Sequence, residues 1–396
     1  MTESFPVPAR DQTPLRRVNE LSVLAVLRDG APRSLREVSH ATGLSWRTTQ
    51  VVAEGLGTHG WLAETEAASE IAGRKAVGRP ARRYRFRAEA GHVVGLDIGV
   101  HRVQVLVADL AAEVVGSGSA MVSPRDPAPD RLAAAQGALN AALAEARLAP
   151  ADIWAAAMGT SGIVGPDGTV TTSALLPGWN GLNPGKLISP SLHCDVEVAN
   201  DANLAALGER WRGHGAKTVI YVLVGTRLGA GLIIDGRLHR GAAGAAGEIG
   251  ALRGAGWPDA AERLATTDIG EGAAGDRDHA AHRVFAAARA GNQAARAAVD
   301  RFAADIAHGI AAMVLTIDPE LVVLGGGFSH AADLLLPRLG AELAGTCPHL
   351  PLLKASALGD DVVALGALRL ALDAVDQRLT ELGSAEPLTA AAIRGL

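Results

Sequence analysis

The chain has 396 residues, of which 48% are hydrophobic and 20% charged, and its formal net charge is −5. This length predicts two or three domains, and the composition is that of a globular protein with full hydrophobic cores. We expect neither a transmembrane helix nor a signal peptide, because no long uncharged apolar run occurs and the N-terminus lacks an apolar segment. Two isolated cysteines, Cys194 and Cys347, predict a reducing, cytoplasmic location.

Charge is unevenly distributed along the chain. Residues 1–90 carry 14 Lys and Arg against 10 Asp and Glu, whereas residues 91–396 carry 23 against 32. Residues 71–90 hold seven basic side chains and one acid, Glu89. A small basic module before a larger acidic one indicates nucleic-acid contact at the N-terminal end, and a solvated charged linker is the alternative.

The first ninety residues predict a small domain, 15–90, after a disordered start at 1–14. Between Leu15 and Leu27 apolar residues recur at three- and four-residue spacing, which predicts a helix that ends before Gly30-Ala31-Pro32. Ser34 then precedes a second, short helix. Glu37 follows three residues later, which completes the sequence pattern of a capping box.

A helix-turn-helix pattern follows. Gly43 marks the turn, Ser45 is placed to cap the next helix, and Val51, Val52 and Leu56 are the expected apolar face of that helix. Small polar residues and an arginine in the first turns of such a helix suit the base edges and phosphates of a major groove. The residues expected to contact DNA here are Ser45, Trp46, Arg47, Thr48, Thr49 and Gln50.

A basic hairpin comes after the helices. Residues 61–64 and 84–87 predict two paired strands, with Gly78-Arg79-Pro80 in the connection between them. This is the pattern of a wing, and Arg79 between glycine and proline is suited to a narrow minor groove. The sequence therefore predicts a mainly α winged helix-turn-helix that binds DNA, with a protein-interaction module as the alternative.

The rest of the chain predicts two α/β lobes of similar plan, 91–215 and 216–375, and a loosely held C-terminal tail, 376–396. Each lobe starts with consecutive strands and continues with helices, and two such lobes facing a cleft can close on a ligand. In the first lobe we expect three strands within 93–120, a helix at 130–147 and a strand at 153–158. In the second lobe we expect strands at 219–224, 231–234, 237–240 and 321–324, and helices within 275–313.

The segment at 221–250 combines strands with glycine-rich bends. The bend at Gly225-Thr226 exposes backbone N–H groups and a hydroxyl, an arrangement that binds anions such as phosphates. Gly247-Glu248 places a carboxylate on backbone that can approach a polar ligand closely. A purely structural glycine hairpin is the alternative.

Head and body together resemble the ROK family (repressors, open reading frames and sugar kinases), and within it the winged-helix transcriptional regulators. The resemblance covers about residues 15–375. It is carried by the motifs VANDANLAALGE (198–209), GTRLGAGLIIDGRLHRG (225–241), GAAGEIG (244–250) and IDPELVVLGGG (317–327). It implies a two-lobed α/β actin-like, ribonuclease-H-like ATPase fold behind the head, and a homodimer or homotetramer.

The resemblance also implies a sugar site. Asp201 matches the family's catalytic base, which would accept a proton from a sugar hydroxyl, and Asn200 and Glu248 match ligands of sugar hydroxyls. For Asp201, a turn that caps the following helix is a structural role that is compatible with the site. The implied ligand-binding residues are Ser161 (where the family has proline), Gly162, Asn180, Asn200, Asp201, Glu248 and Glu262.

The phosphate loops depart from the family's pattern. The kinases read Asp-x-Gly-Gly-Thr where this chain continues from Gly99 with Val100 and His101, so a glycine and a hydroxyl are lost. Phosphoryl transfer depends on positioning, and we therefore expect no enzyme activity. The residues left from the nucleotide loops are Asp97, Gly99, Gly225, Thr226, Gly325 and Gly326.

The family's zinc motif is also altered. Its Glu-x-Gly-His and cysteine-rich loop read here as Glu248-Ile249-Gly250-Ala251, and no His or Cys lies between residues 249 and 262. A tetrahedral zinc site cannot be built from this segment, so we expect no metal and no other cofactor. Trp257 is a candidate to fill the space of the missing zinc loop.

These features predict a transcriptional repressor of carbohydrate metabolism. Its partners would be double-stranded operator DNA, a second copy of the chain, and a small-molecule effector, a sugar or a sugar phosphate, but no membrane. An ATP-dependent hexose kinase with a DNA-binding head is one alternative. A body that has lost its ligand and only dimerises is another.

Overall fold

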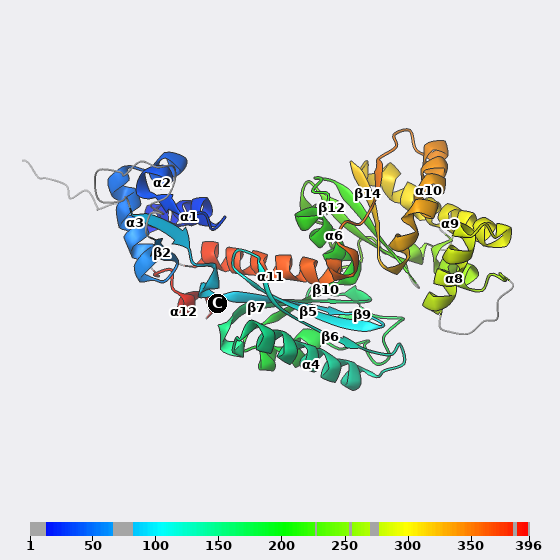
Figure 1. Cartoon of the computed structure of the whole chain (residues 1–396), viewed down its shortest axis with the longest axis horizontal. Coiled ribbons are helices and arrows are strands. Elements are labelled where there is room, and N and C mark those ends of the chain that lie inside the picture. Colours follow the sequence, from blue (N-terminus) through cyan, green and yellow to red (C-terminus); the bar gives the residue numbers. More distant parts are fainter. Residues whose placement is uncertain are drawn as a thin grey trace, which may run out of the picture.

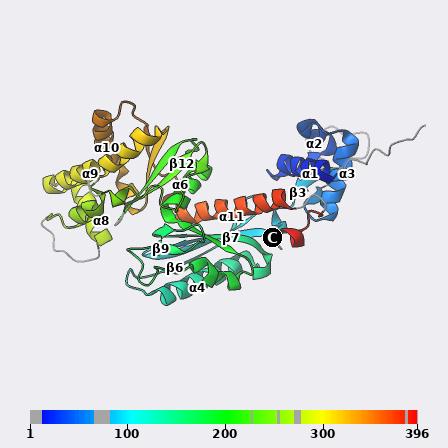
Figure 2. The same cartoon turned by 180° about the vertical axis from the view of Figure 1, so that it is seen from behind.

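The computed structural model describes residues 13–65, 82–225, 228–252, 256–269, 277–382 and 386–394. A head lies at one end of the molecule, two lobes form the remainder, and helix α11 (Val362–Glu381) runs from between the lobes to the head (Figures 1 and 2). None of the described helices has the length and hydropathy needed to span a bilayer. The predicted disordered start up to residue 12, Arg79 and Thr226 lie outside the described residues.

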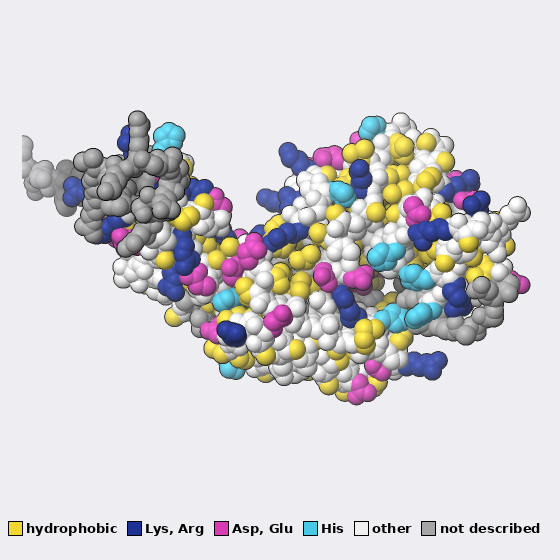
Figure 3. Space-filling model, in the orientation of Figure 1, with side chains coloured by type: hydrophobic (Ala, Val, Ile, Leu, Met, Phe, Trp, Pro, Cys, Tyr) yellow, Lys and Arg dark blue, Asp and Glu magenta, His cyan; other side chains and the backbone are white. Residues whose placement is uncertain are grey.

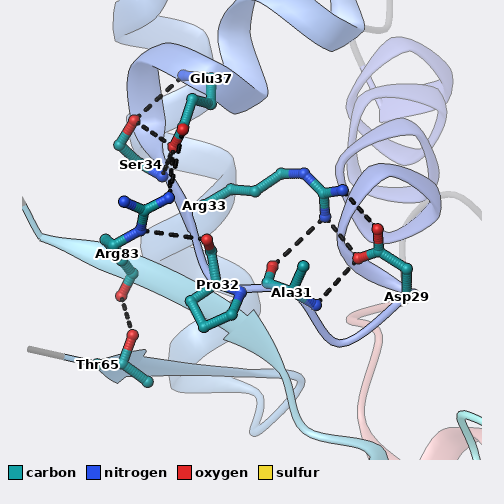
Figure 4. A network of polar contacts seen from close by, with 8 residues as sticks. All are labelled: Asp29, Ala31, Pro32, Arg33, Ser34, Glu37, Thr65 and Arg83. Carbon is teal, nitrogen blue, oxygen red and sulfur yellow. Dashed lines mark hydrogen bonds and ion pairs between the residues drawn. The ribbon is translucent and has the colours of Figure 1, made fainter. Parts of the chain in front are cut away.

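The head has the predicted helix-turn-helix and paired strands. Its strands form an antiparallel sheet in the order β1-β3-β2. The capping box is confirmed, because Ser34 Oγ accepts from the Glu37 N–H at 3.3 Å and the Glu37 carboxylate accepts from the Ser34 N–H at 2.6 Å (Figure 4). Gly43 follows α2 with a φ of 72°, a left-handed conformation that favours glycine. The elements are α1 (Thr13–Leu27), β1 (Arg33–Ser34), α2 (Leu35–Thr42), α3 (Trp46–Thr58), β2 (Leu62–Thr65) and β3 (Arg83–Phe86).

The buried face of α3 differs from the predicted one. Val52 and Leu56 are buried as expected, together with Thr49, whereas the side chain of Val51 is 64% exposed. Residues 49, 52 and 56 follow the three- to four-residue spacing of one helix face, and Val51 is turned away by about 100° from Val52. The prediction that Val51 belongs to the core is therefore wrong.

The first lobe is a five-stranded sheet in the order β10-β7-β4-β5-β6, with β4, β7 and β10 parallel. Helix α4 covers one face and α11 the other (Figure 1). The three consecutive strands and the helix after them are confirmed. The elements are β4 (His92–Ile98), β5 (Arg102–Asp109), β6 (Val114–Met121), α4 (Ala128–Ala146), β7 (Ile153–Thr160), β8 (Ile163–Val164), β9 (Val170–Thr172), α5 (Pro184–Ile188), β10 (Val196–Asn200) and α6 (Asp201–Arg212).

The second lobe repeats the plan with the sheet order β13-β12-β11-β14-β15. Helix α6 packs on one face, and α7 to α10 lie on the other side. Strand β12 starts three residues earlier than predicted, because Leu228 pairs with Val224. The elements are β11 (Val219–Val224), β12 (Leu228–Ile234), β13 (Arg237–Leu238), α7 (Trp257–Ala265), α8 (Arg277–Arg289), α9 (Gln293–Ile317), β14 (Leu321–Gly325), α10 (Ala332–Thr346) and β15 (Leu352–Ala355).

The C-terminal segment is not the loose tail that the sequence predicted. The sequence assigned residues up to 375 to the second lobe, but α11 packs on the first-lobe sheet and continues to Glu381. After it, Leu382, Leu388 and Ile393 are buried, the last of them in α12 (Ala390–Arg394). Apolar burial of this kind fixes a terminal segment, and here it joins the body to the head.

Helices α6 and α11 cross in close contact between the two lobes. A Cβ added to Gly208 would lie 2.4 Å from the carbonyl oxygen of Val362, and one added to Gly366 would lie 1.8 Å from that of Leu204. The crossing therefore requires glycine at both positions. Since α6 begins at Asp201 and α11 reaches the head, this helix pair connects the cleft with the head.

Candidate functional site

The start of α3 is the candidate DNA-contacting surface of the head. Ser45 is the N-cap, with its hydroxyl accepting from the Thr48 N–H at 3.1 Å. Trp46, whose side chain is 57% exposed, and Arg47 lie in the first turn, and Thr48 and Gln50 are half-buried. These residues form an accessible face around the N-terminal end of α3, where backbone N–H groups and the helix dipole attract phosphate.

Thr49 does not share this face. Its side chain is fully buried, and its hydroxyl donates to the carbonyl oxygen of Ser45 at 3.0 Å. The prediction that Thr49 contacts DNA is therefore not compatible with this structure. Its place in the core follows from the same helical spacing that turns Val51 outward.

The arginines of the wing strands are paired within the head. The Arg83 guanidinium contacts the Glu37 carboxylate at 3.1 Å and the Pro32 carbonyl oxygen at 3.1 Å (Figure 4). Arg82 pairs with Glu64 at 3.2 Å, and Arg85 pairs with Glu89 at 2.8 Å. The sequence showed seven basic residues against one local acid, but acids from elsewhere in the head partly neutralise them. Arg79, at the predicted wing tip, lies outside the described residues.

In the body, three parallel strands end at one edge of the first-lobe sheet. Asp97 lies near the end of β4, Thr160 ends β7, and Asn200 ends β10, with Thr160 paired to both Ile98 and Asn200. Carboxyl ends of parallel strands are where ligands bind in open α/β sheets. The space-filling view shows an opening between the lobes, with histidine and basic side chains around it (Figure 3).

Asn200 and Asp201 are held where β10 turns into α6. The Asn200 amide donates to the Gly162 carbonyl oxygen at 3.0 Å and accepts from the Asn203 N–H at 3.0 Å, so Asn200 is the N-cap of α6. Asp201 Oδ1 accepts from the Ala202 N–H at 2.8 Å. The structure thus brings Ser161-Gly162 next to Asn200, as the sugar-site prediction requires.

Asn180 is positioned by the neighbouring loop. Its side-chain oxygen accepts from the Ser173 N–H at 2.6 Å, and the preceding Trp179 is buried with its indole N–H donating to Thr160 Oγ1 at 2.8 Å. Gly162 has a φ of 121°, and a Cβ there would lie 2.3 Å from the carbonyl oxygen of Thr172. Glycine is therefore needed at this point of the loop for the backbone to pass.

Three carboxyl groups, Asp97, Asp201 and Glu248, have raised pKa values. Burial, and then the charge of Asp201, raises the pKa of Asp97 to about 8. Burial also raises the pKa of Asp201 to about 7, with Glu248 as a further cause, and it raises the pKa of Glu248 itself. Glu262 lies on the exposed face of α7, outside this group. Partly desolvated carboxyls such as these accept hydrogen bonds from hydroxyl groups of a ligand.

The nucleotide-loop residues have packing roles of their own. The Gly99 N–H donates to the Arg102 carbonyl oxygen at 3.0 Å, which closes the β4–β5 turn. A Cβ on Gly325 would lie 1.6 Å from the Tyr221 hydroxyl, and Gly326 has a φ of 83°. Gly225 directly follows β11 and is the last residue before a stretch that the structure does not describe. The fold alone therefore requires glycine at 325 and 326, whether or not a phosphate binds there.

Trp257 is a core residue of the second lobe. Its indole N–H donates to the Ile306 carbonyl oxygen at 3.0 Å, and its ring packs against Gly309. Within the described ranges, no three His, Cys, Asp or Glu side chains are grouped so as to hold a metal ion. The absence of a zinc site remains a prediction from the sequence.

Two arginines near the cleft were missed by the sequence reasoning. Arg102 pairs with Asp361 at 3.1 Å, which ties the β4–β5 hairpin to the start of α11. Arg131 is fully buried in α4 and donates to the carbonyl oxygens of Gly99 (2.6 Å), Val100 (3.2 Å) and Ser123 (2.7 Å). The one available signal was an arginine in an otherwise alanine- and leucine-rich helix, which does not by itself indicate burial.

The fold and the cleft define a two-lobed actin-like protein that carries a winged helix-turn-helix head. Residues 93–374 match the model of the ROK family, and the chain belongs to this family. It is 26% identical over 356 residues to the xylose repressor of Caldicellulosiruptor bescii, and the match covers 83% of this chain and 88% of that protein.

Two solved structures show the same architecture. A ROK family glucokinase from Streptomyces griseus, in complex with glucose and AMPPNP, is 25% identical with a TM-score of 0.59, and the match covers 72% of this chain and all of the glucokinase. A ROK family transcriptional regulator, a homologue of the E. coli MLC protein, has a TM-score of 0.67 at 20% identity. That match covers 90% of this chain and 96% of the regulator, and it shows a shared fold.

Proposed function

We propose that the protein is a transcriptional repressor that binds operator DNA through its head and an uncharged sugar in the cleft of its body. The extent of the match to the xylose repressor carries this proposal. A share of 83% is about 329 of 396 residues, whereas the family model spans 282 residues and 22 more follow residue 374. At least about 25 matched residues therefore precede residue 93, in or next to the head. The glucokinase is already matched over its whole length by 72% of this chain, about the size of the body alone.

The surface of the head supports operator binding. Trp46 and Arg47 are exposed at the start of a well-capped helix, where the side chains of a helix-turn-helix contact base edges. A homodimer or homotetramer would present two such helices to half-sites that are about 10 base pairs, or a multiple of this distance, apart. Ser45, Thr48 and Gln50 complete the proposed contact set on this helix, and Arg79 is proposed for the minor groove.

The cleft supports a neutral ligand with several hydroxyl groups. Asp97, Asp201 and Glu248 supply acceptors, and Asn200, Asn180 and the Ser161-Gly162 loop lie at the same edge of the sheet. The phosphate group of a phosphorylated sugar would bring negative charge close to these carboxyls, and placing like charges together costs free energy in a partly desolvated site. We therefore propose a sugar rather than a sugar phosphate. Glu262, which lies on the exposed face of α7, stays a prediction from the family resemblance.

We also infer that the body does not transfer phosphate and holds no zinc. Val100 and His101 occupy the turn where the kinases have a glycine and a hydroxyl, and this turn is fixed by Arg131. Val100 keeps a backbone N–H but adds bulk where glycine lets a phosphate approach closely, and His101 lacks the hydroxyl donor. Phosphoryl transfer needs several donors placed together around the phosphates, and the loss of one such donor typically lowers the rate strongly. A hexose kinase with a DNA-binding head is the alternative function.

Three measurements on the purified full-length chain test this proposal. Selection from a pool of random duplexes should enrich a palindromic sequence at moderate salt, and no enrichment would count against DNA binding. D-xylose and D-glucose are then tested for an increase in melting temperature, because a ligand of the native state stabilises it. Finally, ADP release with ATP and each sugar should stay at background. Turnover that disappears in Asp201→Asn would establish the kinase alternative.

A further inference from the structure

We propose that Arg369 and Asp376 on α11 relay movements of α6 to the head, so that filling the cleft changes operator affinity. This inference rests on the proposed repressor function. It concerns a contiguous series of side chains, Trp211, Arg369, Asp376 and Arg28, that leads from the end of α6 to the end of α1. None of these residues belongs to the proposed sugar or DNA contacts.

The series starts at a helix that a ligand would touch. Asn200 caps α6 and Asp201 is its first residue, so a sugar bound to these side chains acts directly on the N-terminal end of α6. Farther along, α6 meets α11 backbone to backbone at Gly208 and Gly366. Since glycines make this contact, no side chain stands between the two backbones there, and the contact can serve as a pivot.

One helical turn beyond the pivot, the two helices are joined by side chains. Trp211 comes three residues after Gly208, and Arg369 comes three residues after Gly366. The Arg369 guanidinium lies over the Trp211 ring, 5.6 Å from its centroid, and that of Arg212 lies 4.5 Å from it. A change in the crossing angle therefore displaces Trp211 against Arg369.

From Arg369 the contacts continue along α11 to the head. Arg369 Nη2 lies 3.4 Å from Asp376 Oδ2, and the other oxygen of Asp376 is paired with Arg28 at the end of α1. The side chains of Arg369, Asp376 and Arg28 are between 24% and 34% exposed, so water only partly screens these charges. Because Asp376 is shared by two arginines, a shift of Arg369 changes the attraction that Arg28 experiences.

Other contacts keep the head on the body while this happens. Arg17 of α1 donates to the carbonyl oxygens of Leu379 and Glu386, and Trp61 donates to that of Leu388. These bonds anchor the head at the end of α11, close to the Arg28–Asp376 pair. The Arg28–Asp376 pair is therefore placed to influence the orientation of the head relative to the body, while the other contacts keep the head attached.

The test compares Asp376→Asn and Arg369→Gln with two matched controls in the full-length chain. Asp373→Asn removes a second partner of Arg369 but keeps Asp376, and Arg338→Gln removes an equivalent pair with Glu342 on α10. For each variant, the dissociation constant of the selected operator is measured with and without saturating sugar. The sugar is whichever of D-xylose, D-glucose and N-acetyl-D-glucosamine raises the melting temperature of the wild type. The affinity for this sugar is also measured without DNA.

In the wild type we expect the sugar to change operator affinity by about 5- to 150-fold. Asp376→Asn and Arg369→Gln should reduce this ratio about threefold or more, with sugar affinity unchanged within about twofold, while both controls keep the full ratio. Arg369→Lys keeps the charge but loses the planar stacking on Trp211, and it should give an intermediate ratio.

Three results overturn the relay in distinguishable ways. If the wild type is regulated by the sugar and both relay variants keep the full ratio, the relay is wrong and the proposed function stands. If no sugar of the panel changes the operator affinity of the wild type, the proposed function fails and the relay fails with it. If the relay variants lose sugar affinity by the same factor as they lose the effect of sugar on operator affinity, the residues only maintain the structure of the cleft, and the relay is wrong.

Discussion

The indole N–H of Trp61 in the head donates to the carbonyl oxygen of Leu388 at 2.7 Å, near the end of the chain. The same ring packs edge-on against Trp154 of the first lobe, with 5.4 Å between ring centroids. Arg378 of α11 donates to the Trp154 carbonyl oxygen at 2.7 Å. Head, sheet and C-terminal segment thus share one core, although Leu388 is more than 200 residues away from both Trp61 and Trp154 in the sequence.

The C-terminal segment should contribute strongly to stability. Leu388→Ala empties a fully buried site and should lower the free energy of unfolding by about 2–5 kcal/mol. Leu352→Ala is the control, because this leucine is 66% exposed and its loss should cost no more than about 0.5 kcal/mol. Urea unfolding followed by tryptophan fluorescence measures both. Equal effects of the two substitutions would contradict a packed C-terminal segment.

The crossing of α6 and α11 should tolerate no side chain. Gly366→Ala places a methyl group 1.8 Å from the Leu204 carbonyl oxygen, so the helices must separate, and we expect a loss of about 2 kcal/mol or more. Gly137→Ala in α4 meets no atom within 4 Å and should instead stabilise the chain by about 0.5–1 kcal/mol. The melting temperatures of both variants, compared with that of the wild type, test this prediction. A neutral Gly366→Ala would show that the helices are not in close contact.

The first turn of α3 should determine operator affinity without affecting the fold. Arg47→Ala should weaken operator binding by about 1–3 kcal/mol and leave the melting temperature unchanged. Thr49→Val should have the opposite effects. It removes the buried hydroxyl that donates to the Ser45 carbonyl oxygen, so the free energy of unfolding should fall by about 1 kcal/mol, while the affinity for the operator should stay near normal. Gel-shift titrations and thermal melts separate the two. A specific change of base preference in Thr49→Val is the result that would restore the sequence prediction.

The carboxyls of the cleft should make the empty protein less stable at higher pH. Folding raises the pKa of Asp97 to about 8 and that of Asp201 to about 7, from values near 3.8. Between about pH 4 and pH 8 the folded state therefore holds protons that the unfolded chain has released. The unfolded state binds fewer protons in this window, so the free energy of unfolding falls as the pH rises.

Replacing one of these carboxyls should remove part of this dependence. At pH 8, Asp97→Asn should have a higher melting temperature than the wild type and a free energy of unfolding that is larger by at least about 1 kcal/mol. This difference in free energy should shrink toward pH 4.5. Asp259→Asn, at an exposed position of α7, is the control. Melting curves from pH 4.5 to 8.5 provide the measurement. A difference that stays constant over this range would mean that Asp97 is not protonated by folding.

Local patterns in the sequence predicted much of the fold. The capping box at Ser34 and Glu37, the turn at Gly43 and most of the predicted strands depend on neighbouring residues, and the structure confirms them, although β13 ends two residues earlier than predicted and β8, β9, β10 and β15 were not predicted. Val51 and Thr49 were misplaced because small residues two positions apart on a short helix can each fit either face until the packing partners are known. The role of the C-terminal segment was missed because Leu388 and Ile393 form no periodic pattern, and their burial depends on Trp61 and Trp154, which lie far away in the sequence.

The cleft was predictable in part for the same reason. Asn200 and Asp201 follow a strand and begin a helix, an arrangement visible in the sequence, and the family resemblance indicated their role. The neighbourhood of Asp97 and Asp201 depends on the strand order β10-β7-β4, which local sequence does not specify. Arg102 and Arg131 act through backbone carbonyls and a distant acid, and such contacts leave no local pattern.

The contacts of Arg131 affect which substitutions the body can accept during evolution. Its guanidinium supports the β4–β5 turn through the main-chain oxygens of Gly99 and Val100, and main-chain oxygens are the same in every amino acid. These two hydrogen bonds, which support the turn, thus do not depend on which side chains stand at positions 100 and 101. Mutations can accumulate there without unfolding the lobe, so relatives can acquire new ligand preferences at this rim while the scaffold is inherited intact.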